Sequence, residues 1–212
     1  MLVWSGYTLA KRGGLAASGR DRSVWGAGAR PAARLQPRDI NTRYWWRLST
    51  ETLQPSLGPA RHTGDLVHAH LLDLHEEAGK PAEVLLAVPG SMQRDQLALL
   101  LGIVQQCPFD AVGLVNRSVA LGSLFSPSAR LFHLEIQLHQ SLVSELVVRD
   151  NALALQQATP LPGCGLLQLQ ERLVEIIAAE FVRQTRFDPR RKAGTEQALY
   201  DALPAALRAL RS

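Results

Sequence analysis

Segment 68–76 holds the densest group of side chains that could bind a metal. It contains three histidines and two carboxylates: His68, His70, Asp73, His75 and Glu76. On a helix, His68 and His75 share a face because they lie seven positions apart. Zinc sites need three or four such ligands, but no HExxH spacing and no distant further ligand accompany this group. We therefore expect no metal site, and partly exposed helix histidines are the simpler interpretation.

A second polar group lies on a predicted strand. His133, Glu135 and His139 alternate along it, and Glu145 could approach them across a hairpin. Such a group could transfer protons, although a polar strand face explains it equally simply. The chain has neither a Ser-His-Asp motif nor a phosphate-binding loop of the GxxxxGK type. We assign no catalytic residue.

The composition is that of an ordinary globular protein. The chain has 212 residues, of which 46% are hydrophobic, enough for one large domain or two small lobes. No apolar run approaches the roughly 20 residues of a membrane helix, and no basic leader precedes an apolar stretch. Cys107 and Cys164 form no CxxC pair, which is typical of reduced thiols. These features predict a cytoplasmic protein without membrane contact.

Charge is spread unevenly along the chain. Residues 1–62 hold 10 Lys and Arg against 3 Asp and Glu, whereas residues 63–212 hold 13 against 16. A basic first third could meet nucleic acid or an acidic partner. Its arginines form no dense cluster, so a solvated arginine-rich surface is the preferred interpretation and nucleic-acid binding is not expected.

The first half predicts a βαβ unit with flanking helices. A helix is expected from Thr63, as its N-cap, to a stop at Gly79. The wholly apolar run Val84–Val88 predicts a strand covered on both faces, and Ser91 is expected to cap the next helix. The other elements expected here are a strand at 7–10, a helix at 26–35, a loop at 55–59, a helix at 92–106, a strand at 111–115 and a short helix at 118–124.

The second half has a different pattern. Partial alternation over 131–138, 141–148 and 153–158, after a turn at 126–128, predicts an antiparallel three-strand meander. Two helices follow, at 166–185 and 195–211, and Pro204 lies inside the second of them. The chain therefore belongs to the α/β class.

The order of these elements, together with several short motifs, resembles the nucleotide-binding domain of heat-shock-seventy-type chaperones, members of the actin-like ATPase superfamily. The motifs are Val88-Pro89-Gly90 with Gln93-Arg94, Asn116-Arg117-Ser118-Val119-Ala120, Ala179-Glu180-Phe181 and segment 34–42. The resemblance implies a partial ribonuclease-H-like, actin-like fold with a mixed sheet flanked by helices. Residues 1–125 would form a first-lobe-like region, irregular and basic over 1–62. Residues 126–212 would form part of a second lobe.

The departures from this family concern its chemistry. The family binds ATP through two glycine-rich hairpins, and segment 133–138, at the place of the second one, has no glycine. The first hairpin is expected before about residue 6 and is absent. Arg117 stands where the family has an acidic residue. Trp46 lies near the place of the family's conserved-motif lysine, and segment 203–207 lies where the family binds adenosine. Gly163 and Gly165 are the remaining nucleotide-side candidates, although turn glycines explain them as simply.

The sequence therefore predicts a pseudo-ATPase rather than an enzyme. We expect a non-catalytic scaffold that has no cofactor. It would bind a protein partner or a second copy of itself, with Trp45 and Trp46 as contact residues. The alternative is a nucleotide-binding chaperone-type ATPase, which would use ATP and Mg²⁺ and whose chain has been misassigned or truncated.

Overall fold

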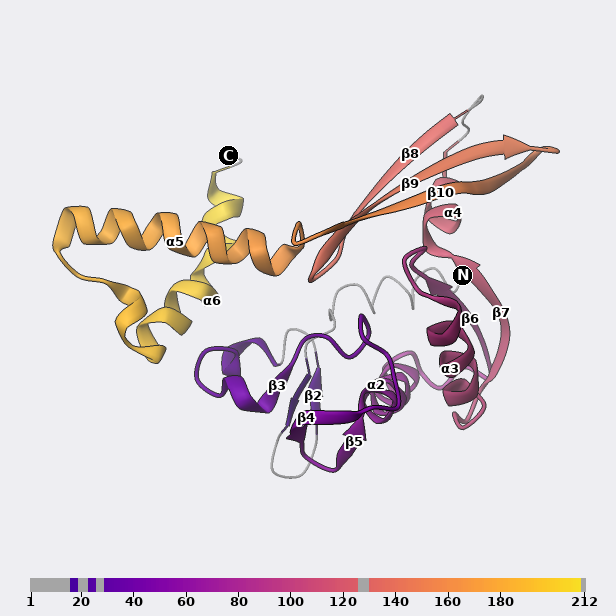
Figure 1. Ribbon diagram of the computed structural model, residues 1–212, viewed down its shortest axis with the longest axis horizontal. Helices are drawn as coiled ribbons and strands as arrows, with labels where there is room; N and C mark the ends of the chain where they lie inside the picture. Colours follow the sequence, from indigo (N-terminus) through magenta and orange to yellow (C-terminus); the bar gives the residue numbers. More distant parts are fainter. Residues whose placement is uncertain (1–15, 19–22, 26–28, 126–129, 211–212) are drawn as a thin grey trace.

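The computed structural model describes residues 16–18, 23–25, 29–125 and 130–210 (Figure 1). The chain is mixed α/β, as the sequence predicts, but its strands form four small sheets in the described ranges rather than one mixed sheet. The strand predicted at 7–10 and the turn predicted at 126–128 lie outside these ranges. None of the described helices is long and apolar enough to cross a membrane.

The first part of the chain forms two small antiparallel sheets. Strand β1 (Ala16–Ser18) pairs with β2 (Ser23–Trp25) on one side and with β3 (Ile40–Asn41) on the other. Strands β4 (Thr52–Leu57) and β5 (Ala60–His62) form a hairpin. The loop predicted at 55–59 is therefore only partly right, since residues 55–57 belong to β4 and residues 58–59 form the turn. In the described part of the predicted helix 26–35, only Arg30–Ala32 is helical, as a 3-10 turn (η2) with Pro31 in its first turn.

The βαβ unit is present. Strand β6 (Glu83–Val88) pairs in parallel with β7 (Asp110–Asn116), and helix α3 (Arg94–Val104) connects them. Helix α2 (Thr63–Glu77) precedes the unit, and Gly79 follows it with a φ of 81°. The helix starts were predicted wrongly. His62 accepts the amide of Asp65 at the start of α2, and Gln93 rather than Ser91 is the N-cap of α3.

The meander is also confirmed. Strands β8 (Arg130–Ile136), β9 (Gln140–Arg149) and β10 (Ala152–Pro162) form an antiparallel sheet in the order β10-β9-β8. Helix α4 (Arg117–Gly122) packs on one face, where Gly122 lies against Leu131, Leu146 and Leu153. Helix α5 (Leu166–Thr185) leaves the opposite end of the sheet, as Figure 1 shows.

Among the described residues, two hydrophobic clusters join several of these elements, and a third, minor one consists of Ala29 with Ile40. The larger joins α2, α3, β6 and segment 44–57, and includes Tyr44, Val67, Leu86 and Leu100. The smaller joins α5 and α6 (Ala193–Ala209), which follows the 3-10 turn η4 (Pro189–Arg191). Pro204 lies inside α6, and Ala33, far away in the sequence, packs against this second cluster.

The β6–β7 sheet and the meander both leave apolar side chains in contact with solvent. In β6 only Leu86 is buried, whereas Leu85, Val112 and Leu114 of the same sheet are exposed. The prediction that Val84–Val88 is covered on both faces is therefore wrong. The face of the meander opposite α4 exposes Phe132, Leu134 and Ile136.

Candidate functional site

The two glycines expected at a nucleotide site lie between β10 and α5. Gly163 has a φ of +73°, the left-handed conformation that favours glycine at a turn. At Gly165 a Cβ atom would lie 2.5 Å from the carbonyl carbon of His139 and from the carbonyl oxygen of Leu138. Gly165 therefore allows α5 to approach the β8–β9 turn closely.

The N-terminus of α5 already has partners for its first amides. The Leu166 amide donates to the Gln137 carbonyl at 2.8 Å, and the Leu167 amide donates to the Leu138 carbonyl at 3.0 Å. A phosphate bound here would have to displace both bonds. The site of Gly163 and Gly165 is thus built to hold a turn, and its geometry does not favour a phosphate.

An open hollow of about 330 Å³ adjoins these glycines. Its lining consists of Ile136, Gly163, Cys164, Gly165, Gln168 and Leu169. None of these side chains carries a positive charge, whereas phosphate sites in proteins use Lys, Arg or free backbone amides. The hollow therefore suits an apolar group better than a nucleotide.

Trp45 and Trp46 point to different environments. Trp45 packs against the larger core cluster, and its indole Nε1 donates to Nδ1 of His70 at 3.0 Å. Trp46 lies at the surface and stacks on His139, with ring centroids 5.3 Å apart and an angle of 18° between the rings. Of the two predicted contact residues, Trp46 is therefore the one whose ring a partner could reach.

Two arginines surround the Trp46–His139 stack. The guanidinium carbons of Arg43 and Arg47 lie 5.6 and 5.3 Å from the Trp46 ring. Burial lowers the pKa of His139, and the nearby Arg43 and Arg47 lower it further, although a hydrogen bond to the Thr42 carbonyl opposes the shift. The stack joins the segment before β4 to the turn between β8 and β9, two regions that the resemblance places in different lobes.

An ion pair occupies the place where the resemblance puts ATP chemistry. Arg117, at the start of α4, lies 3.3 Å from Glu135 of β8, and the side-chain amide of Gln137 donates to the same carboxylate. Both charged side chains are largely buried. Acidic side chains hold Mg²⁺ and water in phosphoryl transfer, whereas here the carboxylate is neutralised by an arginine.

Glu145 does not join His133 and Glu135. In the sheet register Glu145 pairs with Phe132 on the opposite face and forms an ion pair with Arg130 at 3.1 Å. Ser144, not Glu145, lies opposite His133, and it is fully buried. The register therefore does not bring a carboxylate to His133 across the hairpin, and the acid–base group considered from the sequence does not form.

The histidines of α2 are not arranged as metal ligands. His70 is buried against Tyr44 and Trp45, whereas His75 hydrogen bonds with the Pro81 carbonyl at 3.0 Å. His68 faces the Gln106 carbonyl. Within the described ranges no group of three or more His, Cys, Asp or Glu side chains could hold a metal ion.

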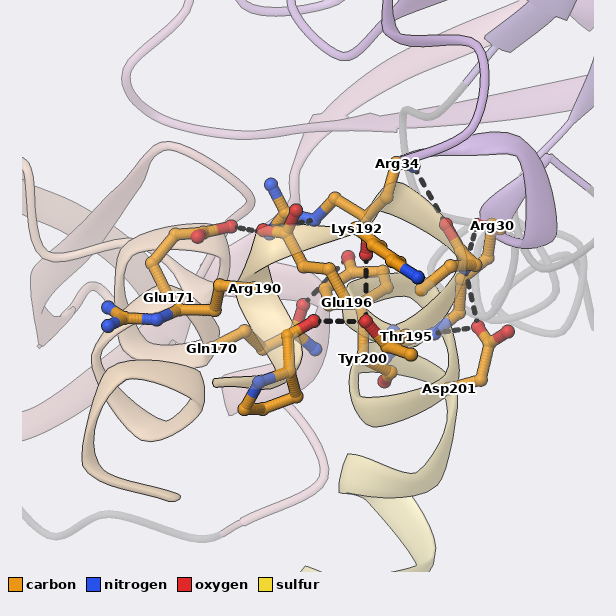
Figure 2. Close-up of polar contacts among 12 residues, drawn as sticks. Arg30, Arg34, Gln170, Glu171, Arg190, Lys192, Thr195, Glu196, Tyr200 and Asp201 are labelled. Carbon is orange, nitrogen blue, oxygen red and sulfur yellow. Dashed lines mark hydrogen bonds and ion pairs between the residues drawn. The ribbon is translucent and has the colours of Figure 1, made fainter. Parts of the chain in front are cut away.

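A further polar cluster was not expected from the sequence. Arg30 and Arg34 both stack over the ring of Tyr200, with guanidinium carbons 4.0 and 5.0 Å from its centre (Figure 2). Arg34 also forms ion pairs with Glu171 and Glu196, so that α5 and α6 are both held to segment 30–34. Arg30, which lies 3.8 Å from Asp201, and Arg34 are thus both paired with acidic side chains of the last two helices.

The comparisons with known proteins place no family on this chain. No protein-family model matches it, and no curated protein matches it significantly.

Proposed function

We propose that this protein is a non-catalytic scaffold of actin-like, heat-shock-seventy-like descent that works by binding another polypeptide. The observation that carries the proposal is the Arg117–Glu135 ion pair at the junction of α4 and β8, where the resemblance places the chemistry of ATP. A carboxylate that is already paired with a guanidinium is poorly suited to hold a magnesium ion.

The environment of the two glycines supports the same proposal. The first amides of α5 donate to carbonyls of the β8–β9 turn, and the adjoining hollow has no cationic lining residue. Nucleotide binding would require donors that this arrangement already uses elsewhere.

The exposed apolar surface favours a polypeptide partner. Phe132 and Leu134 are each 61% exposed, and Ile136 is 55% exposed. Contiguous exposed apolar patches on a folded protein usually mark contact sites. We propose that this face contributes to the contact surface, together with Trp46, which stacks on His139 of the β8–β9 turn.

Calorimetric titration with Mg-ATP tests the proposal. The expected result is no saturable heat at nucleotide concentrations up to about 1 mM, the upper end of the usual range of enzyme KM values. Binding in the micromolar range, or ATP hydrolysis abolished by Arg117→Ala, would instead favour a chaperone-type ATPase.

A further inference from the structure

Strand β8 is the outer strand of the meander, and its far edge pairs with no strand in the described part of the chain. Its neighbour in the described chain is β9 alone. The Gln137 amide donates to the Gln140 carbonyl, which fixes the alternation of hydrogen-bonded pairs along the two strands. The N–H and C=O groups of Phe132, Leu134 and Ile136 therefore point away from β9, toward this far edge.

The side chains of these same residues are also uncovered. All three project from the face opposite α4 and are more than half exposed. Val143 lies beside Leu134, and Leu161 continues the apolar face on β10. Natural edge strands usually carry a proline, a lysine or a bulge that prevents pairing. Strand β8 has neither proline nor lysine, and its pairing with β9 is regular. Its two charged side chains, Arg130 and Glu135, are each paired within the chain, with Glu145 and Arg117.

We propose that β8 pairs antiparallel with β8 of a second copy of this chain, about a two-fold axis that passes through Leu134. The inference rests on the proposed function, because it names the second copy as the partner. The result is one continuous six-stranded sheet, joined by about six backbone hydrogen bonds across the new edge.

The sequence of β8 is complementary to itself in this register. On the exposed face Phe132 lies opposite Ile136 of the second copy, and Leu134 lies opposite its own counterpart. Apolar and aromatic pairs of this kind stabilise antiparallel sheets. The strand therefore supplies both halves of the contact, as a two-fold interface requires.

The other face offers complementary hydrogen-bonding groups. In the same register His133 lies opposite Glu135 of the second copy, once on each side of the axis. Nδ1 of His133 and Oε2 of Glu135 have no hydrogen-bond partner among the described residues, and because their own chain already covers both atoms, these side chains would have to turn toward the edge to meet the second copy. Buried polar atoms rarely stay unpaired. A shift of two residues, with the axis at His133, would instead place His133 against itself and Glu135 against Leu131.

Cysteine cross-linking tests the register. In a Cys164→Ser background, Leu134→Cys should form a covalent dimer on mild oxidation. The two Cα atoms lie about 5.5 Å apart at the axis, within the range of a disulfide. Phe132→Cys and Ile136→Cys should each cross-link poorly alone and efficiently when mixed. Stronger self-linking of Phe132→Cys than of Leu134→Cys, or no cross-link at all, would overturn the proposal.

Sedimentation of the uncross-linked protein tests the interface independently. The wild type should show a monomer–dimer equilibrium at micromolar concentration. Leu134→Lys should weaken it at least about 10-fold, because the lysine would meet its own counterpart at the axis. Val112→Lys, at an exposed site on β7, is the matched control and should leave the dimer unchanged. Circular dichroism checks that both variants are folded.

The outcomes separate the two proposals. Association that Leu134→Lys leaves intact would overturn pairing through β8 but not the scaffold function. A wild type that stays monomeric at about 100 µM would also overturn self-pairing. Tight Mg-ATP binding would contradict the scaffold function whether or not the dimer forms.

Discussion

At the scale of single residues, Gly165 can be tested for a structural role. A Cβ there would meet backbone atoms at 2.5 Å, and backbone cannot move aside as a side chain can. Gly165→Ala should therefore lower the free energy of unfolding by about 2 kcal/mol or more. Gly194→Ala is the control, since a Cβ at this position in α6 would have no neighbour within 4 Å and alanine favours helices. Urea unfolding of both variants gives the measurement, and equal stabilities would contradict a close-approach role.

His139 makes a second residue-scale prediction, for the pH dependence of stability. Its pKa is lowered in the folded protein, so the unfolded chain binds the proton more readily. Its stabilising contribution is thus present above the unfolded pKa of about 6.5 and is lost as pH falls toward the folded pKa. The urea midpoint of wild-type unfolding should decrease when the pH is lowered from about 7.5 to about 5.5. His139→Gln should make this decrease smaller. An unchanged slope in the variant would show that other groups dominate.

At the scale of elements, neighbouring leucines of β6 report on the two faces of its sheet. Leu86 is 8% exposed and belongs to the larger core cluster, whereas Leu85 is 38% exposed. Leu86→Ala should cost about 3 kcal/mol and Leu85→Ala less than about 1 kcal/mol. Chemical denaturation of Leu86→Ala and Leu85→Ala measures the two losses in the free energy of unfolding. Equal losses would mean that both faces are covered, as the apolar run alone suggests.

The contact between segment 30–34 and helices α5 and α6 makes a second prediction at this scale. Arg34 joins Glu171, Glu196 and the ring of Tyr200 while its side chain is largely buried. Arg34→Ala should speed amide exchange in α6 several-fold, because the helix loses partners on one side. Arg38→Ala, at an exposed position nearby, should leave the exchange rates unchanged. Hydrogen exchange followed by mass spectrometry measures both, and equal protection in the two variants would contradict a clamping role.

How far the sequence predicts this structure depends on the range of the interaction. Helix α5 was predicted with its observed ends, and the parallel β6–β7 pair and the meander were predicted in the right order, since their signals are local periodicity. The N-cap of α2 was not, because the Thr63 hydroxyl bonds with the distant carbonyls of Arg47 and Ser49. The Arg30–Tyr200 contact spans 170 positions, and no local pattern indicates it. Burial and long-range pairing therefore had to come from the structure.

For the whole molecule, the uneven charge offers a rival mode of association. The net charge of +4 divides into +7 over residues 1–62 and −3 over the rest, so that one copy could bind another head to tail. Such contacts form open chains rather than closed dimers. They are also screened by salt, because the Debye length falls from about 30 Å at 0.01 M to about 3 Å at 1 M.

Pairing through β8 predicts the opposite response. Backbone hydrogen bonds and apolar side chains carry it, so the dimer should persist from about 0.05 M to about 0.5 M sodium chloride and strengthen in sulfate. Sedimentation velocity across this series distinguishes a closed dimer from a growing polymer. Dissociation on adding sodium chloride would point to the basic first third as the contact. The attraction between the basic first third of one copy and the acidic remainder of another is weakened, because Arg30 and Arg34 already face acidic side chains of their own molecule. These side chains are Asp201, Glu171 and Glu196. That internal neutralisation is the reason to expect the salt-resistant dimer.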